Sequence, residues 1–220
     1  MTMEMTAEEL LERYAAGERD FTGVQFKNTK GGRIDLSGAN LSGAIFRNAS
    51  FPRGSRFKKT NLSGADLRGA NLYDTELTGV NLSFANLNRA RLESSEILLE
   101  EGANLQGVNL SEANMVDIHW ENVEMNDVNL FIVNLFHGAI FNSSLKRANF
   151  EGGMLAEVYM NAVNLEGANF RGCELAESCF SDCNLTGAFL DEYNATAYLR
   201  SYYDLYNTIM PDGSVVSNCK

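Results

Sequence analysis

The chain is poor in the residues that most catalytic and metal sites use. Its 220 residues contain two histidines, His119 and His137, and four cysteines without C-x-x-C spacing. No segment matches G-x-S-x-G, a phosphate-binding Walker loop or the zinc motif H-E-x-x-H. Cys179 and His119 are far apart in the sequence, and the repeat places them three coils from one another, too far for a nucleophile and its base. We therefore expect no enzyme activity, no cofactor and no bound metal.

Long apolar stretches are also missing. No run approaches the roughly 18 residues that cross a membrane, and no basic segment followed by an apolar one opens the chain as in a signal peptide. The cysteines look like thiols outside disulfides, which is typical of a reducing compartment. These absences predict a cytoplasmic protein without a membrane partner, and a hydrophobic content of 45% still provides a substantial core.

Basic residues are scarce in one half of the chain. The formal net charge is −11, but residues 1–99 contribute +1 and residues 100–220 contribute −12. From Glu100 to Leu145 there are seven acids and no Lys or Arg. Excess acid disfavours nonspecific binding to DNA, RNA or anionic lipid. We therefore expect no direct nucleic-acid partner.

A five-residue period runs through most of the chain. Every fifth residue from Leu105 to Leu190 is large and apolar, and the residue two positions before each is small or β-branched. The blocks Leu36–Phe51 and Phe57–Ile97 show the same pattern, and Phe21 and Phe26 already lie in that frame. One extra residue separates the two blocks, and three extra residues precede Leu105.

This period fits neither a helix of 3.6 residues per turn nor a strand of period two. It fits a chain that turns a corner every five residues, with a large and a small side chain pointing inward and three pointing out. Four corners close a square coil, and successive coils pair as parallel β-bridges about 4.8 Å apart. The sequence therefore predicts an all-β solenoid of roughly eight coils.

Segments such as ANLSGA, ADLRGANLYDTEL and VNLEGANFRGCEL resemble the A-(D/N)-L-x-x signature of the pentapeptide-repeat family. The resemblance covers about residues 19–192 and implies a right-handed quadrilateral parallel β-helix, whose handedness comes from the family. The terminal segments LLERYAAGERDF and IMPDGS resemble those of cyanobacterial members that influence heterocyst differentiation. From this likeness we take the group and not the specific role.

Both ends of such a rod need a cover, because an open coil exposes core and unpaired strand edge. Thr6 and Glu9 form a capping box for a helix over residues 7–16, and Gly17 stops it. Leu10, Leu11 and Tyr14 form a face suited to the first coil. We expect a helical cap at residues 1–18, the β-helix at 19–192 and a C-terminal cap at 193–220.

The repeat ends after Leu190, and five of the eight tyrosines follow. Tyr198, Tyr202 and Tyr206 fit one helical stripe, together with two leucines. This stripe is either a lid on the last coil or a homodimer surface, since tyrosine serves interfaces well. Related gyrase-binding members of the family dimerise at this end, so we expect a monomer or a homodimer through the C-terminal end.

Outward residues twenty positions apart stack in columns. One column contains only asparagines, whose amides can bond one another: Asn109, Asn129, Asn149 and Asn169. Another column is acidic and contains Asp117, Glu157 and Glu177, with His137 among them. His137 between two acids should gain proton affinity.

One coil, from Asn126 to Leu145, carries aromatic residues on three successive corners. Phe131, Phe136 and Phe141 follow inward positions and should point outward, and Ile132 adds to them. Clustered outward apolar residues usually indicate a contact surface. The alternative is a local frame shift that buries Phe141 in place of its neighbour.

Three functions compete. The first is a non-catalytic protein-interaction or regulatory scaffold with an unidentified protein partner, because stacked coils build long rigid faces. The second, implied by resemblance to the quinolone-resistance branch of the family, is an acidic DNA mimic that binds a type II topoisomerase or another DNA-binding protein. The third is a structural rod whose basic start and acidic end attract head to tail.

Overall fold

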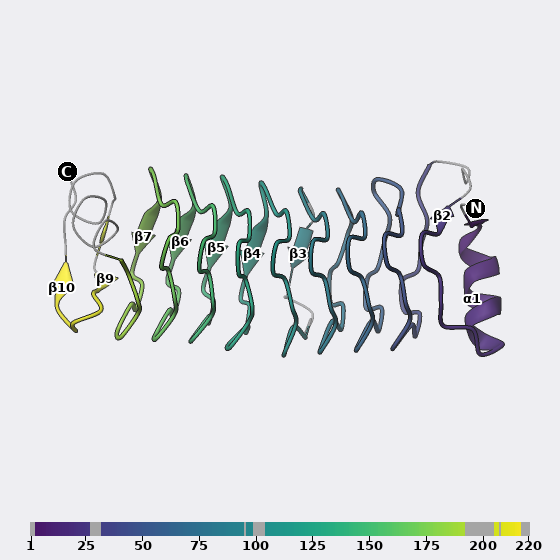
Figure 1. Cartoon of the computed structure of the whole chain (residues 1–220), viewed down its shortest axis with the longest axis horizontal. Coiled ribbons are helices and arrows are strands. Elements are labelled where there is room, and N and C mark those ends of the chain that lie inside the picture. Colours follow the sequence, from purple (N-terminus) through teal and green to yellow (C-terminus); the bar gives the residue numbers. More distant parts are fainter. Residues whose placement is uncertain are drawn as a thin grey trace.

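The protein folds as a right-handed quadrilateral parallel β-helix, which confirms the expected fold. The computed structural model describes residues 3–26, 32–94, 96–98, 104–191, 205–206 and 208–216. Its coils stack side by side along one long axis, with helix α1 at one end and strand β10 at the other (Figure 1).

Most coils are held by isolated parallel bridges on the sides of the square, and one side widens into a regular sheet. This sheet is parallel and six-stranded, in the order β3-β4-β5-β6-β7-β8. Its strands are β3 (Glu96–Leu98), β4 (His119–Glu121), β5 (Ala139–Phe141), β6 (Tyr159–Asn161), β7 (Cys179–Ser181) and β8 (Leu205–Tyr206). It forms one flat side of the rod, and side chains there alternate between the core and the surface.

The bridge register confirms both interruptions of the period. Asn109 pairs with Asn129, which is the spacing of an uninterrupted coil. The pairing of Asp35 with Arg56 is longer by one residue, and the pairing of Asn81 with Asn104 is longer by three. The longer pairings are confined to these places, and the bridges on either side of them keep the stacking in register.

Two longer coils were not foreseen. Asp20 pairs with Ile45, and near the other end Asn184 pairs with Ile209. Each of these pairings spans one whole pentad more than the pairing of an uninterrupted coil. Phe21 points inward as the repeat predicts. The first coil, however, is five pentads long and not four. A period of five cannot reveal the insertion in the first coil, because an added pentad leaves the frame unchanged, and near the other end the repeat stops after Leu190, so no frame indicates the pairing with Ile209.

The inward residues form one continuous core. Trp120, Phe150 and Leu165 are completely buried, and Leu105 is 3% exposed. Phe150 stacks on Phe170 from the next coil, with ring centroids 4.9 Å apart and planes 6° from parallel. Stacked rings and small inward residues fill the axis at the density that protein interiors require.

Helix α1 (Ala7–Ala15) begins as expected. Thr6 Oγ1 accepts a hydrogen bond from the Glu9 amide, and the Glu9 carboxylate accepts one from the Thr6 amide, which completes the capping box. Beyond Ala16, Gly17 takes a φ of 101° and ends the helix. The Glu18 amide donates to the Arg13 carbonyl and the Gly17 amide to the Tyr14 carbonyl, as in a Schellman motif.

The face that α1 turns toward the first coil differs in one residue from the expected set. Leu10 is completely buried, and the Tyr14 hydroxyl donates to the Ser42 carbonyl at 2.7 Å. Leu11 is 36% exposed, so its predicted place in this face is wrong. Leu11 lies about 100° from Leu10 and about 60° from Tyr14 around the helix, so it sits at the edge of the face that meets the coil, where its side chain stays partly open to solvent.

The cap also includes two strands that the sequence did not indicate. β1 (Glu4–Met5) pairs in parallel with β2 (Gln25–Phe26). Met5 is 1% exposed and joins the core. The chain therefore covers the strand edge of the first coil before α1 covers its apolar opening.

The helical stripe predicted after Leu190 is wrong at Tyr206. Leu205 and Tyr206 form β8, which pairs in parallel with β7 and continues the stack. β9 (Thr208–Ile209) then pairs with β10 (Val215–Val216) in an antiparallel hairpin. Tyr198 and Tyr202 lie outside the described residues, so a dimer surface at this end stays a prediction.

Candidate protein-contact surface

One corner of the square coil forms a continuous edge along the rod. Backbone amides link its successive turns: Asn48 donates to Arg68, Gly69 to Asn88, Arg89 to Ser111, and Glu112 to Phe131. We call this line of turns the first edge, made of the residue pairs Arg47–Asn48, Arg68–Gly69, Asn88–Arg89, Ser111–Glu112 and Phe131–Ile132. The basic N-terminal turns and the apolar turn thus lie on one edge.

The second residue of each turn adopts the left-handed conformation. Many turns place glycine there, but Ile132 occupies it with φ 54° and Phe84 with φ 59°. A β-branched side chain in this region is strained, because its Cβ approaches the following carbonyl. Ile132 is also 49% exposed, so burial of its side chain offsets little of the strain.

The apolar residues of the coil at 126–145 lie outside the core, in the predicted register. Phe131 is 37% exposed and Phe136 is half-buried. Ile132 covers Gly152 of the next coil, where an added Cβ would meet its Cγ1 at 3.3 Å. Whether this surface contacts a partner stays a prediction.

Phe141 points outward, so the alternative of a frame shift is wrong. Its neighbour Ile140 is completely buried in β5, and Phe141 is half-buried on the outer face of the sheet. The Phe141 ring lies 5.1 Å from the His119 ring and 5.5 Å from the Tyr159 ring. Three strands thus contribute one aromatic stripe to the flat side.

Several exposed apolar residues were not predicted from the sequence. Tyr159 is 40% exposed and Met154 is 48% exposed, and both come from the coil after the aromatic one. Met154 pairs through its backbone with Asn134, which precedes Phe136 in the aromatic coil. Outward residues twenty positions apart stack on one another, as in the acidic column. The same step applied from the aromatic coil leads to Met154 and Tyr159, so it could have predicted both. We call Phe131, Ile132, Phe136, Phe141, Met154 and Tyr159 the apolar surface.

The acidic column contains one close pair. His137 Nδ1 lies 2.6 Å from Asp117 Oδ1. This hydrogen bond and the negative charge of Asp117 raise the pKa of His137 above its ordinary 6.5, and Glu157 adds to the effect. The imidazole is exposed, so the pair is a local electrostatic feature of the surface.

The asparagine column supports the stacking and adds nothing to the apolar surface. Asn129 donates to Asn109 at 3.2 Å, and Asn169 donates to Asn149 at 3.1 Å. Side-chain carbonyl oxygens in the column also accept from the amide two positions later, as Asn129 does from Phe131 at 3.2 Å. These side chains therefore shape the turns that present the outward residues.

Other chemistry-bearing residues are dispersed. Cys173 and Cys183 are buried, burial raises the pKa of each thiol to about 12, and neither forms a disulfide. His119 and Cys179 lie on β4 and β7, with two strands between them. In the described part of the chain, no three His, Cys, Asp or Glu side chains lie close enough to hold a metal ion. Within the same ranges no helix has the length and apolar character to cross a membrane.

Comparison with known proteins identifies the repeat. The family model described as pentapeptide repeats matches in 8 copies, over residues 20–53, 55–93, 103–130, 143–178 and 155–191. No curated protein sequence matches the chain.

Several solved structures also match the chain. HetL, a pentapeptide repeat protein involved in heterocyst differentiation regulation in the cyanobacterium Nostoc sp. strain PCC 7120, is 27% identical with a TM-score of 0.55, covering 96% of this chain and 100% of HetL. A trypsin-treated variant of QnrB1, a plasmid-mediated fluoroquinolone resistance protein, is 18% identical with a TM-score of 0.48, covering 89% and 94%. A pentapeptide repeat protein of the Arabidopsis thaliana thylakoid lumen is 28% identical with a TM-score of 0.27, covering 56% and 66%.

Proposed function

The chain belongs to the pentapeptide-repeat family, and from that premise we propose that it is a non-catalytic, cytoplasmic interaction scaffold whose apolar surface binds a regulatory protein partner. The observation that carries this proposal is Ile132, which is exposed and held at a strained φ of 54°. Glycine or asparagine would occupy that turn at lower free energy. Strained and exposed apolar residues concentrate where contact with another molecule compensates for them.

The size and rigidity of the site support the same function. The apolar surface spans two neighbouring coils and more than one side of the square, and backbone hydrogen bonds tie its turns to the coils on either side. A surface that is already ordered loses little conformational entropy on binding. Aromatic side chains in such a setting commonly supply most of the binding energy.

The charges around the apolar surface indicate the partner's chemistry. Glu112 and Glu151 flank Phe131 on the first edge, and Asp117 and Glu157 flank the turn after Phe136. Between residues 104 and 145 there is no Lys or Arg. We therefore infer a partner surface with an apolar centre and a basic rim, whose association slows as salt screens the attraction.

The likeness to HetL, which is named for a role in the regulation of heterocyst differentiation, supports a regulatory scaffold as the general class. The acidic half gives less support to a DNA mimic. His137 interrupts its acidic column and pairs with Asp117, so the negative charge is not a continuous track. Absence of gyrase inhibition at micromolar protein would remove that alternative.

The test is a photo-crosslinker placed at Ile132 in cells, followed by binding measurements with the captured protein after purification. Phe131→Ser combined with Phe136→Ser should weaken that complex about a thousandfold, since interface aromatics that act as hot spots contribute about 2 kcal/mol each and every 1.4 kcal/mol is about a factor of ten. β-type circular dichroism should stay unchanged, because both side chains lie outside the core.

Phe84→Ser is the matched control. Phe84 is 67% exposed, and it lies on a different corner, over Gly107. It should leave the affinity unchanged. Equal loss with Phe84→Ser, or full affinity of the double variant, would contradict the proposal. If the captured protein is a second copy of this chain, sedimentation should show a dimer that the double variant converts to monomer.

A further inference from the structure

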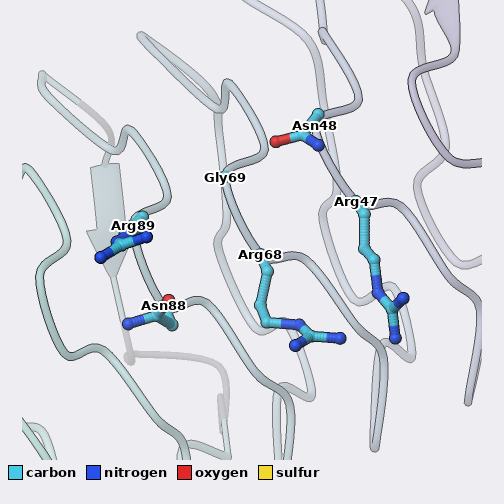
Figure 2. A pocket seen from close by; sticks show the side chains of 6 residues that line it. All are labelled: Arg47, Asn48, Arg68, Gly69, Asn88 and Arg89. Atoms are coloured by element: carbon cyan, nitrogen blue, oxygen red, sulfur yellow. The ribbon is translucent and has the colours of Figure 1, made fainter.

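The N-terminal part of the first edge contains a shallow groove of about 290 Å³. Six residues from three successive turns line it, and none is a carboxylate: Arg47, Asn48, Arg68, Gly69, Asn88 and Arg89. Figure 2 shows Arg47 and Arg68 extending in the same direction from adjacent coils, with Asn88 and Arg89 on the next coil. A groove lined only by cationic, amide and glycine residues is suited to an anion.

Two of the arginines are positioned by one acid at the side of the groove. Asp66 accepts two hydrogen bonds from Arg68, both at 2.8 Å, and one from Arg47 Nε at 2.6 Å. These bonds and the charge of Arg68 lower the pKa of Asp66 to about 2, so the carboxylate is ionised at neutral pH. The side chains are therefore held in place before any ligand arrives.

The contacts to neighbouring acids leave several guanidinium donors unused. A guanidinium has five N–H groups, and the contacts to Asp66 engage one on Arg47 and two on Arg68. Arg89 contacts Glu112 at 2.7 Å. Hydrogen bonds from the three arginines thus reach two carboxylates, Asp66 and Glu112. Asp20 acts on Arg47 only through its charge. Several guanidinium N–H groups therefore have no contact to an acid among the described residues.

Gly69 keeps the middle of the groove open. A Cβ built at this position would clash with Asn48 Oδ1, so any side chain would displace the Asn48 amide. Figure 2 shows that amide lying beside Gly69. The open turn allows a ligand to reach donors from the coils on both sides of it.

We propose that this groove binds a phosphate group, either on a phosphorylated side chain of a protein or on a free phosphate compound. A phosphate monoester offers three oxygens and a charge of about −1.5 to −2, so it can accept hydrogen bonds from guanidinium groups of more than one coil at once, whereas a carboxylate has two oxygens and a single charge. The site is independent of the apolar surface, because its donors and its ligand chemistry are different.

The two sites lie on the same edge of the rod. Arg89 pairs with Glu112, and the Glu112 amide donates to the Phe131 carbonyl at 2.7 Å, so a single coil separates the groove from the apolar turn. If the phosphate is on a protein bound at Phe131, a phosphorylated residue at the edge of that protein could reach Arg89.

The test is a titration of the full chain with inorganic phosphate at low ionic strength, followed by amide NMR. Saturable shifts should be largest at Asn48 and Gly69. Arg47→Gln should weaken binding about tenfold, since a hydrogen bond to a charged group is lost. This variant keeps the two Arg68–Asp66 bonds, so the coil should stay folded, and a single cooperative thermal transition with only a small drop in melting temperature would verify that.

Arg147→Gln is the matched control, because Arg147 is exposed and paired bidentately with Asp127 at 2.6 Å outside the groove. It should leave phosphate binding unchanged. A phosphoserine peptide that binds more tightly than inorganic phosphate identifies a protein source, and equal affinity identifies a free phosphate compound. Absence of saturable shifts, full affinity of Arg47→Gln, or equal binding of the unphosphorylated peptide would overturn the proposal.

Discussion

The first edge has the same backbone throughout but opposite chemistry in two regions. Its turns at residues 47–48, 68–69 and 88–89 carry arginine, whereas the turn at 131–132 carries phenylalanine and isoleucine. Both regions have the same turn hydrogen bonds and a fully buried inward residue, such as Phe46 and Leu130. The fold therefore requires apolar residues at the inward positions, whereas the residue types at the outward positions can differ from coil to coil and so can be adapted to binding.

The outward residues of the two regions also differ in their effect on stability. In the basic region, Arg47 and Arg68 form ion pairs with Asp66, whose side chain is only 19% exposed. In the apolar region, Ile132 is strained and exposed. Residues of the basic turns thus contribute to folding, and Ile132 opposes it. Substitutions in the two regions should change the free energy of unfolding in opposite directions.

The largest effect is expected for Asp66→Asn. At pH 7 it should lower the free energy of unfolding by about 1 to 2 kcal/mol, after allowance for partial solvent access. The pKa of Asp66 is lowered from 3.8 to about 2, so the stabilisation is fully present above pH 3.8 and disappears as the pH falls toward 2. Urea unfolding of both proteins between pH 7 and pH 2 measures the difference.

Asp127→Asn provides the comparison for Asp66→Asn. Asp127 and its partner Arg147 are both 61% exposed, so this ion pair should contribute much less. Equal destabilisation by the two substitutions would show that the shared, partly buried carboxylate has no special role in the basic region.

A smaller effect of opposite sign is expected for Ile132→Gly. Glycine adopts positive φ without strain, whereas isoleucine is destabilised there by about 1 to 2 kcal/mol. The greater backbone entropy that glycine loses on folding offsets part of this gain, so the variant should be more stable by about 0.5 to 1 kcal/mol. The same variant should bind the partner more weakly. Thermal unfolding and the binding assay measure the two effects on one protein.

Asn142→Gly is the matched control, since Asn142 holds the same turn position on another corner with φ 48°. Asparagine tolerates this conformation better than isoleucine does, so the gain in stability should be smaller. A stability loss in Ile132→Gly would mean that Ile132 stabilises the coil through Gly152 and that its exposure needs no partner.

The fold could be predicted because the period of five constrains every inward residue. The same frame predicted the outward direction of Phe131, Ile132 and Phe136. It also showed both short interruptions, because one or three added residues shift the frame. The longer coil from Asp20 to Ile45 could not be seen, because an added pentad leaves the frame intact.

The sites were harder to predict because they combine residues from different coils. Arg47, Arg68 and Arg89 are not spaced at the twenty-residue step of the repeat, and Arg89 occupies the second position of its turn where the other two occupy the first. The one-residue insertion between Phe51 and Phe57 adds to the offset between coils. Aligning the sequence in steps of twenty residues therefore does not place these arginines together. The backbone hydrogen bonds between stacked turns do place them together.

The smallest effect is expected at the acidic column, where Asp117→Asn should lower the pKa of His137 toward 6.5. The hydrogen bond to Asp117 is the main cause of its raised pKa, and the charge of Glu157 is a minor one. Glu157→Gln should therefore lower it less than Asp117→Asn does. Because the folded pKa is raised, the stabilisation is fully present below pH 6.5 and is lost as the pH rises through the folded pKa. NMR titration of the imidazole protons measures both variants, and a larger shift in Glu157→Gln would mean that the column acts through its summed charge, as a mimic of a polyanion would require.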